Sequence, residues 1–232
     1  MRRAPIYLLI DTSGSMYGEP IIAVQNGLKT CIEALRTDPE SMEKAYVSII
    51  TFNNDAQNII PLTYIQDLGT LPELKAEGGT SMGAAIELLN EQIEKDLVKN
   101  TAESKGDYKA FVLLLTDGHP TDNDKLTKEI AKINRKKIKY FIGAITPTPL
   151  NKDQDVEKIQ EALKKITNSD EVIYLPSSDA NTFKRFFEWV SQSASKSISK
   201  GDDDNHGDGP VDDGPLGELP PLPFGNDDSE IL

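Results

Sequence analysis

An uninterrupted apolar run, residues 4–10 (Ala-Pro-Ile-Tyr-Leu-Leu-Ile), ends abruptly at the polar stretch 11–15 (Asp-Thr-Ser-Gly-Ser). A run of this length that is rich in Ile and Leu is typical of a strand buried on both faces of a sheet. The polar stretch then lies at the carboxyl end of this strand, which is where open α/β sheets bind ligands. We therefore expect the chain to fold around a sheet that carries a ligand site at this edge.

Three oxygen-bearing side chains alternate along the polar stretch: Asp11, Ser13 and Ser15. Because they alternate, all three can face one point, and Gly14 allows the backbone to bend tightly around that point. Carboxylates and hydroxyls are suitable ligands for a hard cation such as Mg²⁺. In isolation, however, the same stretch is equally consistent with a turn that caps a helix.

The rest of the chain alternates apolar runs with segments of helical periodicity. Strands are expected at residues 4–10, 45–52, 56–62, 110–115, 139–145 and 171–175, and helices at about 19–37, 81–97, 124–135, 155–166 and 180–193. This alternation predicts an α/β fold with a single doubly wound, mostly parallel six-stranded sheet of the Rossmann-like kind. Residues 56–62 are expected to form one antiparallel edge strand, because the short turn before them cannot make a parallel crossover.

Two more loops carry oxygen-bearing side chains. Thr80 lies in Gly-Gly-Thr-Ser-Met-Gly (78–83), and Asp117 follows the continuous apolar run 110–115. A strand order of 3-2-1-4-5-6 places the strand ending at Asp11 beside the strand before Asp117, at the topological switch point, so the two carboxylates converge. Each loop alone also fits a helix N-cap or an ordinary turn. The three loops in this order favour one shared site.

These three motifs resemble the metal-ion-dependent adhesion site (MIDAS) of von Willebrand factor A (VWA) domains, as found in integrin inserted domains. That family combines Asp-x-Ser-x-Ser after a strand with a Thr from a second loop and an Asp from a third. The resemblance covers roughly residues 4–193 and implies the VWA fold. It also implies a metal ion held by five residues: Asp11, Ser13, Ser15, Thr80 and Asp117.

The sequence around these motifs is similar to that of bacterial TerY-like VWA proteins of tellurium-resistance loci. It lies in Pro-Ile-Tyr-Leu-Leu-Ile-Asp-Thr-Ser-Gly-Ser-Met (5–16), Gly-Glu-Pro (18–20) and Thr-Asp-Gly-His-Pro-Thr-Asp (116–122). This resemblance implies an intracellular protein of tellurite resistance or stress response, whose partners are a protein kinase and a metal-dependent protein phosphatase. Some TerY-like proteins carry a zinc-binding extension, but this chain has no Cys or His cluster to form one.

The function that we expect is that of a metal-dependent protein-binding module, not an enzyme. Mg²⁺ is the expected cofactor, with Mn²⁺ or Ca²⁺ as alternatives, and the resemblance implies that a partner protein donates an Asp or Glu to the metal. The alternative is a Mg²⁺-dependent phosphohydrolase that uses Asp11 as a phosphoryl-accepting nucleophile, as in haloacid-dehalogenase-type phosphatases. Those enzymes need a second Asp two residues later, where this chain has Ser13, and a P-loop sequence is missing.

Charge and composition limit the classes of partner. The tail, residues 201–232, has ten acidic residues and no Lys or Arg, so it carries −10 of the formal net charge of −13. Neither the tail nor the rest of the chain offers a basic stripe for nucleic acid. No run approaches the roughly 20 apolar residues that span a bilayer, and a single cysteine permits no intrachain disulfide. We therefore expect a cytoplasmic protein without a membrane span or a nucleic-acid partner.

The resemblance and the change of composition together divide the chain into an expected VWA domain (1–197) and an acidic tail rich in Gly, Pro and Asp (198–232). The tail combines high net charge with few apolar residues, so we expect it to be disordered when free. Its carboxylates can act as an internal ligand of the metal. We favour two alternatives over this idea: a solubilising linker, or a docking segment in which Pro220 to Pro223 adopt polyproline II.

Four other residues have expected roles outside the metal site. Cys31 is expected to be a small core residue of the first helix, and His119 to be solvated. Asp122 is expected to cap the helix that follows it. Trp189 is expected to pack the last helix onto the sheet, together with Phe183, Phe186 and Phe187.

Overall fold

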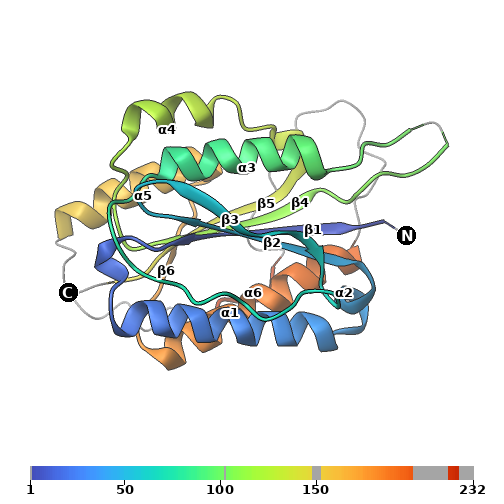
Figure 1. Ribbon diagram of the computed structural model, residues 1–232, viewed down its shortest axis with the longest axis horizontal. Coiled ribbons are helices and arrows are strands. Elements are labelled where there is room, and N and C mark those ends of the chain that lie inside the picture. Colours follow the sequence, from blue (N-terminus) through green and yellow to red (C-terminus); the bar gives the residue numbers. More distant parts are fainter. Residues whose placement is uncertain (1, 102, 148–152, 201–218, 225–232) are drawn as a thin grey trace.

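The computed structural model describes residues 2–101, 103–147, 153–200 and 219–224 (Figure 1). Its centre is a six-stranded sheet of order β3-β2-β1-β4-β5-β6. Every neighbouring pair is parallel except β2 and β3, which are antiparallel. The predicted doubly wound, mostly parallel sheet with one antiparallel edge strand is confirmed, and so is the predicted strand order.

The strands are β1 (Ala4–Asp11), β2 (Ala45–Phe52), β3 (Ala56–Tyr64), β4 (Ala110–Thr116), β5 (Ile138–Ile145) and β6 (Ile173–Tyr174). The α-helices are α1 (Glu19–Thr37), α2 (Pro39–Lys44), α3 (Met82–Asp96), α4 (Asn123–Ile130), α5 (Asp153–Thr167) and α6 (Ala180–Lys200). Two short 3₁₀ helices are η1 (Gly14–Met16) and η2 (Arg135–Lys137). Among the described residues no helix is long and apolar enough to cross a membrane.

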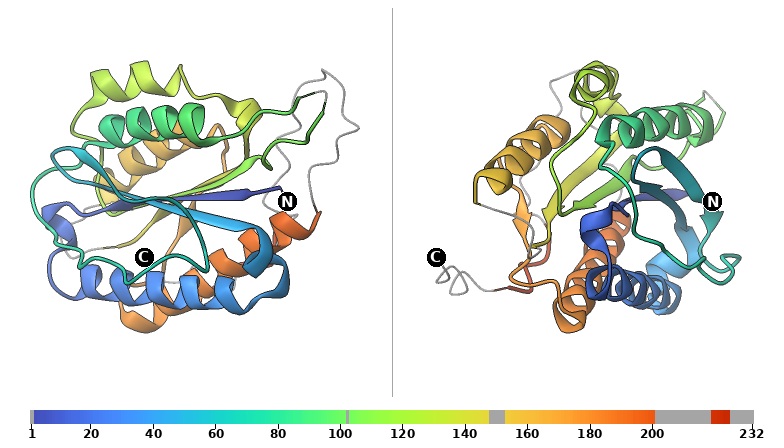
Figure 2. Two further views of the ribbon diagram at one scale, coloured as in Figure 1. Left: turned by 45° about the vertical axis from the view of Figure 1, so that its right-hand side comes forward. Right: turned by 60° about the vertical axis from the view of Figure 1, so that its left-hand side comes forward.

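Helices cover both faces of the sheet. Figures 1 and 2 show α1, α2 and α6 on one face and α3, α4 and α5 on the other. The two faces bury separate apolar clusters, since successive strand residues point to opposite sides. In β1, Ile6, Leu8 and Ile10 face α1 and α6, whereas Tyr7 and Leu9 face α3. Every residue of β1 and β4 is buried, which explains their uninterrupted apolar sequences.

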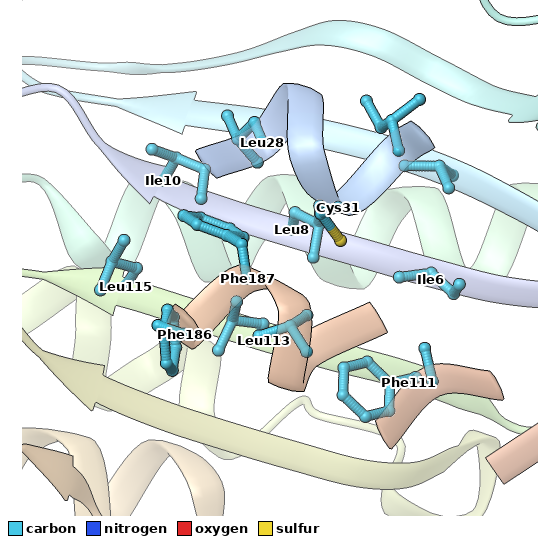
Figure 3. Packing of buried hydrophobic residues seen from close by; sticks show 14 of the residues in the cluster. Ile6, Leu8, Ile10, Leu28, Cys31, Phe111, Leu113, Leu115, Phe186 and Phe187 are labelled. Carbon is cyan, nitrogen blue, oxygen red and sulfur yellow. The ribbon is translucent and has the colours of Figure 1, made fainter. Parts of the chain in front are cut away.

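The layer of α1 and α6 is held together by aromatic side chains. Phe186 and Phe187 of α6 are fully buried with their rings in edge-to-face contact at 5.4 Å, and both lie between the two helices and the strands (Figure 3). Cys31 is buried in the same cluster, which raises the pKa of its thiol to about 12 by desolvation. Gly27 of α1 leaves room for the Phe187 ring. The expected core roles of Cys31 and of the α6 aromatics are therefore confirmed.

The structure differs from the expected elements in several places. The helix expected at about 124–135 ends at Ile130, and the strand expected at 171–175 spans only Ile173–Tyr174. Helix α2 was not expected, and it follows directly from Asp38, whose carboxylate accepts a hydrogen bond from Ser41 N at 2.8 Å. The last helix continues to Lys200, beyond the expected end of the domain. Residues 219–224 of the tail, expected to be disordered, lie against α6. The rest of the tail lies outside the described residues.

Gly27 offers a test of the packing between α1 and α6. Replacing Gly by Ala inside a helix normally stabilises it by about 1 kcal/mol. In Gly27→Ala, however, the new Cβ would lie 2.3 Å from Phe187 Cδ2, and overpacking of a core typically costs about 1–3 kcal/mol. We expect a net decrease in the free energy of unfolding, measured by urea denaturation. Asn26→Ala, an exposed change in the same turn, is the matched control, and a Gly27→Ala protein as stable as this control would contradict the tight contact.

Candidate functional site

The sheet brings two aspartates together at its carboxyl edge. β1 and β4 are parallel neighbours with Ile10 opposite Leu115. Asp11 is the last residue of β1, and Asp117 follows β4 directly. Both carboxylates are completely buried. The predicted convergence of Asp11 and Asp117 is thus what the topology produces.

The two serines of the first loop face the second aspartate. Ser15 Oγ donates a hydrogen bond to Asp117 Oδ1 at 2.7 Å, and Ser13 Oγ lies 3.5 Å from the same oxygen. The two hydroxyl oxygens are 3.0 Å apart. η1 curls the chain so that these alternate residues point to one place. Four of the five predicted site residues therefore form a contiguous cluster of oxygens.

Asp11 is fixed by two hydrogen bonds, one from the end of β4 and one from its own loop. Thr116 Oγ1 donates to Asp11 Oδ2 at 2.6 Å, and Ser13 N donates to Asp11 Oδ1 at 2.7 Å. The role of Thr116 was missed from the sequence. Its place directly before Asp117 at the end of a strand was the available signal, because the side chain there points across to the adjacent strand end.

The pKa of Asp11 is raised to about 7, chiefly because burial disfavours the charged form and secondly because the Asp117 carboxylate repels it. Hydrogen bonds from Thr116 and Ser13 act in the opposite direction. Ionisation of two buried carboxylates side by side is unfavourable unless a positive charge lies near them. A divalent cation bound between the loops supplies that charge.

Thr80 enters the cluster from a second loop. Gly14 N donates to Gly78 O at 3.0 Å, and Thr121 N donates to Thr80 O at 3.0 Å, so this loop is tied to both others. Thr80 is only 6% exposed. Its hydroxyl lies so close to Gly118 that a Cβ on this glycine would be 3.0 Å from Thr80 Oγ1. The Thr80 hydroxyl therefore lies beside Gly118, the residue that follows Asp117.

The turn between β2 and β3 holds the second loop in place. Gly79 N donates to Asn54 Oδ1 at 2.7 Å, and Ser81 Oγ donates to Asn54 O at 3.0 Å. Gly78 has a φ of +76°, and a Cβ there would meet the Asn54 side chain at 2.6 Å, so only glycine fits. Sequence reasoning missed Asn54, because a contact between separate loops leaves no local pattern.

Asp122 caps a different helix from the one expected. Its two carboxylate oxygens accept hydrogen bonds from Gly83 N and Ala84 N, both at 2.9 Å, at the start of α3. At the start of α4, the helix it was expected to cap, its side chain makes no cap hydrogen bond. Asp122 therefore ties the third loop to α3, the helix that follows the second loop. The prediction that Asp122 caps α4 was wrong.

The oxygens of the site fit a hard divalent cation. Two carboxylates and the hydroxyls of Ser13 and Ser15 lie together, with the Thr80 hydroxyl in the adjoining loop, and two negative charges balance a dication. Among the described residues no group of three or more His, Cys, Asp and Glu side chains could hold a metal. A metal site at this edge would therefore depend on the hydroxyls of Ser13, Ser15 and Thr80.

Exposed side chains follow the site residues closely in the sequence. Tyr17 is 79% exposed and Ile22, in the first turn of α1, is 61% exposed. His119 is also exposed, as expected.

Two known proteins are similar to this chain in sequence. In Synechocystis sp., the uncharacterized protein sll0103 is 30% identical over 135 residues, which cover 55% of this chain and 29% of that protein. The inter-alpha-trypsin inhibitor heavy chain H2 of Mus musculus is 24% identical over 195 residues, covering 80% of this chain and 20% of the relative. The chain thus spans less than a third of either relative's length.

A solved structure shows the same fold. Proximal thread matrix protein 1 of the mussel byssus, described with a zinc-occupied MIDAS motif, has a TM-score of 0.56 and 20% identity over 84% of this chain and 46% of its own. The family model of the von Willebrand factor type A domain matches residues 6–189, a span that contains all five residues of the site. This match shows that the chain belongs to the von Willebrand factor type A domain family.

Proposed function

We propose that this protein is a metal-dependent protein-binding module whose MIDAS-type site comprises Asp11, Ser13, Ser15, Thr80 and Asp117. The observation that carries the proposal is the cluster of the Ser13 and Ser15 hydroxyls with two fully buried carboxylates, with the Thr80 hydroxyl beside Gly118 in the adjoining loop. A buried pair of like charges is unfavourable by itself, so its presence at a ligand-binding edge favours a cation.

Mg²⁺ is the ion that we propose, with Mn²⁺ or Ca²⁺ as alternatives. Mg²⁺ prefers six oxygen ligands and is usually held by only one or two carboxylates, which matches two aspartates among neutral hydroxyls. Support for a divalent ion also comes from the mussel protein, whose MIDAS motif is described as zinc-occupied. A bound dication would supply an electrophilic point at the surface of the domain.

The proposed ligand is an Asp or Glu side chain of a partner protein. With two aspartates balancing the dication, an incoming carboxylate can complete its coordination. The exposed Tyr17 and Ile22 would contact apolar groups beside that carboxylate. The sequence resemblance to TerY-like proteins suggests a cytoplasmic setting, tellurite or stress resistance, and a protein kinase and a metal-dependent phosphatase as partners.

The phosphohydrolase alternative gains no support from the geometry. Asp11 is 0% exposed, and both of its oxygens accept short hydrogen bonds from Ser13 N and Thr116 Oγ1. A nucleophilic carboxylate must present a free oxygen to phosphorus. The position two residues after it is Ser13, so the second aspartate of such enzymes is absent from this loop.

Removing the Asp11 carboxylate tests the metal site. We expect wild-type protein to bind Mg²⁺ or Mn²⁺ in calorimetry and Asp11→Ala to bind at least about tenfold more weakly, as when a supporting group of a metal site is lost. Asp124→Asn is the matched control, because Asp124 is an exposed carboxylate just after the third loop. Equal affinity of wild type and Asp11→Ala would place the metal elsewhere.

The buried carboxylate pair also makes metal-free stability depend on pH. The pKa of Asp11 is raised from 3.8 to about 7, so the folded state binds the proton more tightly than the unfolded state. Stability in EDTA should therefore be highest below pH 4 as far as this group is concerned, and should fall as the pH rises towards 7. Asp117→Asn keeps an oxygen for Ser15 and removes the repulsion. In EDTA at pH 8, we expect the free energy of unfolding of Asp117→Asn to be about 1–3 kcal/mol higher than that of wild type. This difference is the equivalent of one or two pKa units.

With saturating Mg²⁺ the order should reverse, because ligand binding stabilises only the protein that binds. Denaturation curves with EDTA and with Mg²⁺ measure both states of both proteins. If Asp117→Asn were less stable than wild type in EDTA, the two carboxylates would not repel each other as the geometry indicates.

The binding function is tested by capture of partners on immobilised protein. We expect a partner from the native lysate to be retained with Mg²⁺ and lost with EDTA or in Thr80→Val, which keeps the size of Thr80 but removes its hydroxyl. Thr127→Val, an exposed change on α4, is the control. A partner retained in EDTA would show that binding does not use the metal, and a phosphatase activity that needs Asp11 but not Thr80 would support the enzyme alternative.

A further inference from the structure

The proline-rich segment Leu219 to Phe224 (Leu-Pro-Pro-Leu-Pro-Phe) lies against α6, beside the short edge strand β6 (Figure 2, right). Leu219 is only 5% exposed and belongs to the core cluster beneath α6, and Phe224 packs against the same cluster. Leu222 is 45% exposed. The segment is thus anchored at its two ends, and one side of it faces solvent.

Two side chains of α6 bind the backbone of this segment. Trp189 Nε1 donates a hydrogen bond to Pro220 O at 2.9 Å, and the Arg185 guanidinium donates to Pro223 O. Arg185 and Trp189 are four residues apart, so they share one face of the helix. The carbonyls of Pro220 and Pro223 are three residues apart, the spacing that puts carbonyls on one side of a polyproline II helix.

The contacts suit a proline-rich ligand in particular. Proline has no N–H, so this segment cannot join the sheet edge as a regular strand. A binding site must therefore contact its carbonyls and its apolar side chains. The Arg185 guanidinium also lies 5.3 Å from the centre of the Phe224 ring, within the range of a cation–π contact. Aromatic side chains that donate to backbone carbonyls are the usual way in which proteins bind polyproline segments.

The segment does not fill the space beside it. A groove of about 560 Å³ runs between the segment, Trp189 and the start of β6, where Val172 and Ile173 form part of the wall. Leu219 reaches the core cluster, but the groove leaves a space along one side of the segment, unlike the packing of a chain inside a core. The segment therefore lies on the surface of the domain and is anchored there by Leu219.

We propose that the face of α6 carrying Arg185 and Trp189, with the adjoining edge at β6, is a binding site for proline-rich segments of the Leu-Pro-Pro-x-Pro-aromatic kind. Its occupant is this chain's own residues 219–224, bound in cis. The site uses none of the five residues of the metal site. This proposal is therefore independent of the proposed metal-dependent function, and each can be tested without the other.

Trp189 is the only tryptophan of the chain, so its fluorescence reports on the site directly. In the full chain, we expect Leu219→Asp to release the segment, shift the Trp189 emission to longer wavelength and increase its quenching by acrylamide. Leu222→Asp is the matched control, because it places the same charge at an exposed position of the same segment. Identical spectra for the two variants and wild type would overturn the proposal.

Binding in trans provides the second part of the test. A capped synthetic peptide of residues 219–224 should bind the Leu219→Asp protein and restore its emission. Wild-type protein should resist the peptide up to roughly millimolar concentration, the effective concentration of a tethered ligand. Absence of binding to Leu219→Asp would overturn the proposal. A wild-type spectrum that changes on dilution would show that the occupant comes from a second copy, which contradicts binding in cis.

Arg185→Ala keeps the proposal testable if Leu219→Asp does not fold, because Arg185 is exposed. Added to Leu219→Asp, it should weaken peptide binding at least about tenfold, the loss expected for a hydrogen bond from a charged donor. Alone in the full chain, it should increase acrylamide quenching of Trp189, whereas the exposed neighbour change Lys184→Ala should not. Equal quenching in these two single variants would overturn the proposal.

Discussion

The adjacency of β1 and β4 is the constraint on which the rest of the site depends. It places Asp11 and Asp117 side by side in a region without solvent, where each raises the free energy of the other's charged form. Hydrogen bonds from Thr116 and the first loop offset part of this cost. The surrounding loops must therefore be held rigidly, and the contacts of Asn54 and Asp122 do so from two directions.

Much of the fold was readable from the sequence because its signals are local. The apolar runs of β1 and β4 have no alternation, since both of their faces are covered by helices. The three-residue turn before β3 excluded a parallel crossover and so identified the antiparallel edge. Once the strand order was inferred, the convergence of Asp11 with Asp117 followed from topology alone.

What the sequence did not reveal depends on contacts between distant residues. Asp122 precedes α4 and has the composition of an N-cap for it, yet its carboxylate binds the start of α3, 38 and 39 residues earlier in the chain. Trp189 fits the helical spacing of a core residue, and its indole N–H gave no sign of a partner 31 residues later. The packing of the whole domain determines these hydrogen-bond partners, and no local sequence pattern indicates them.

The mixture of donors in the site also bears on what it can bind. In the proposed metal site, hydroxyls from Ser13, Ser15 and Thr80 would supply oxygen without charge, so only Asp11 and Asp117 would neutralise a dication. Three or four carboxylates would give the ion a net negative surrounding and would repel an incoming acid. A site limited to two, both buried beneath the loops, leaves its outward side attractive to a carboxylate. The chemistry of the ligands themselves therefore favours recognition of an acidic partner.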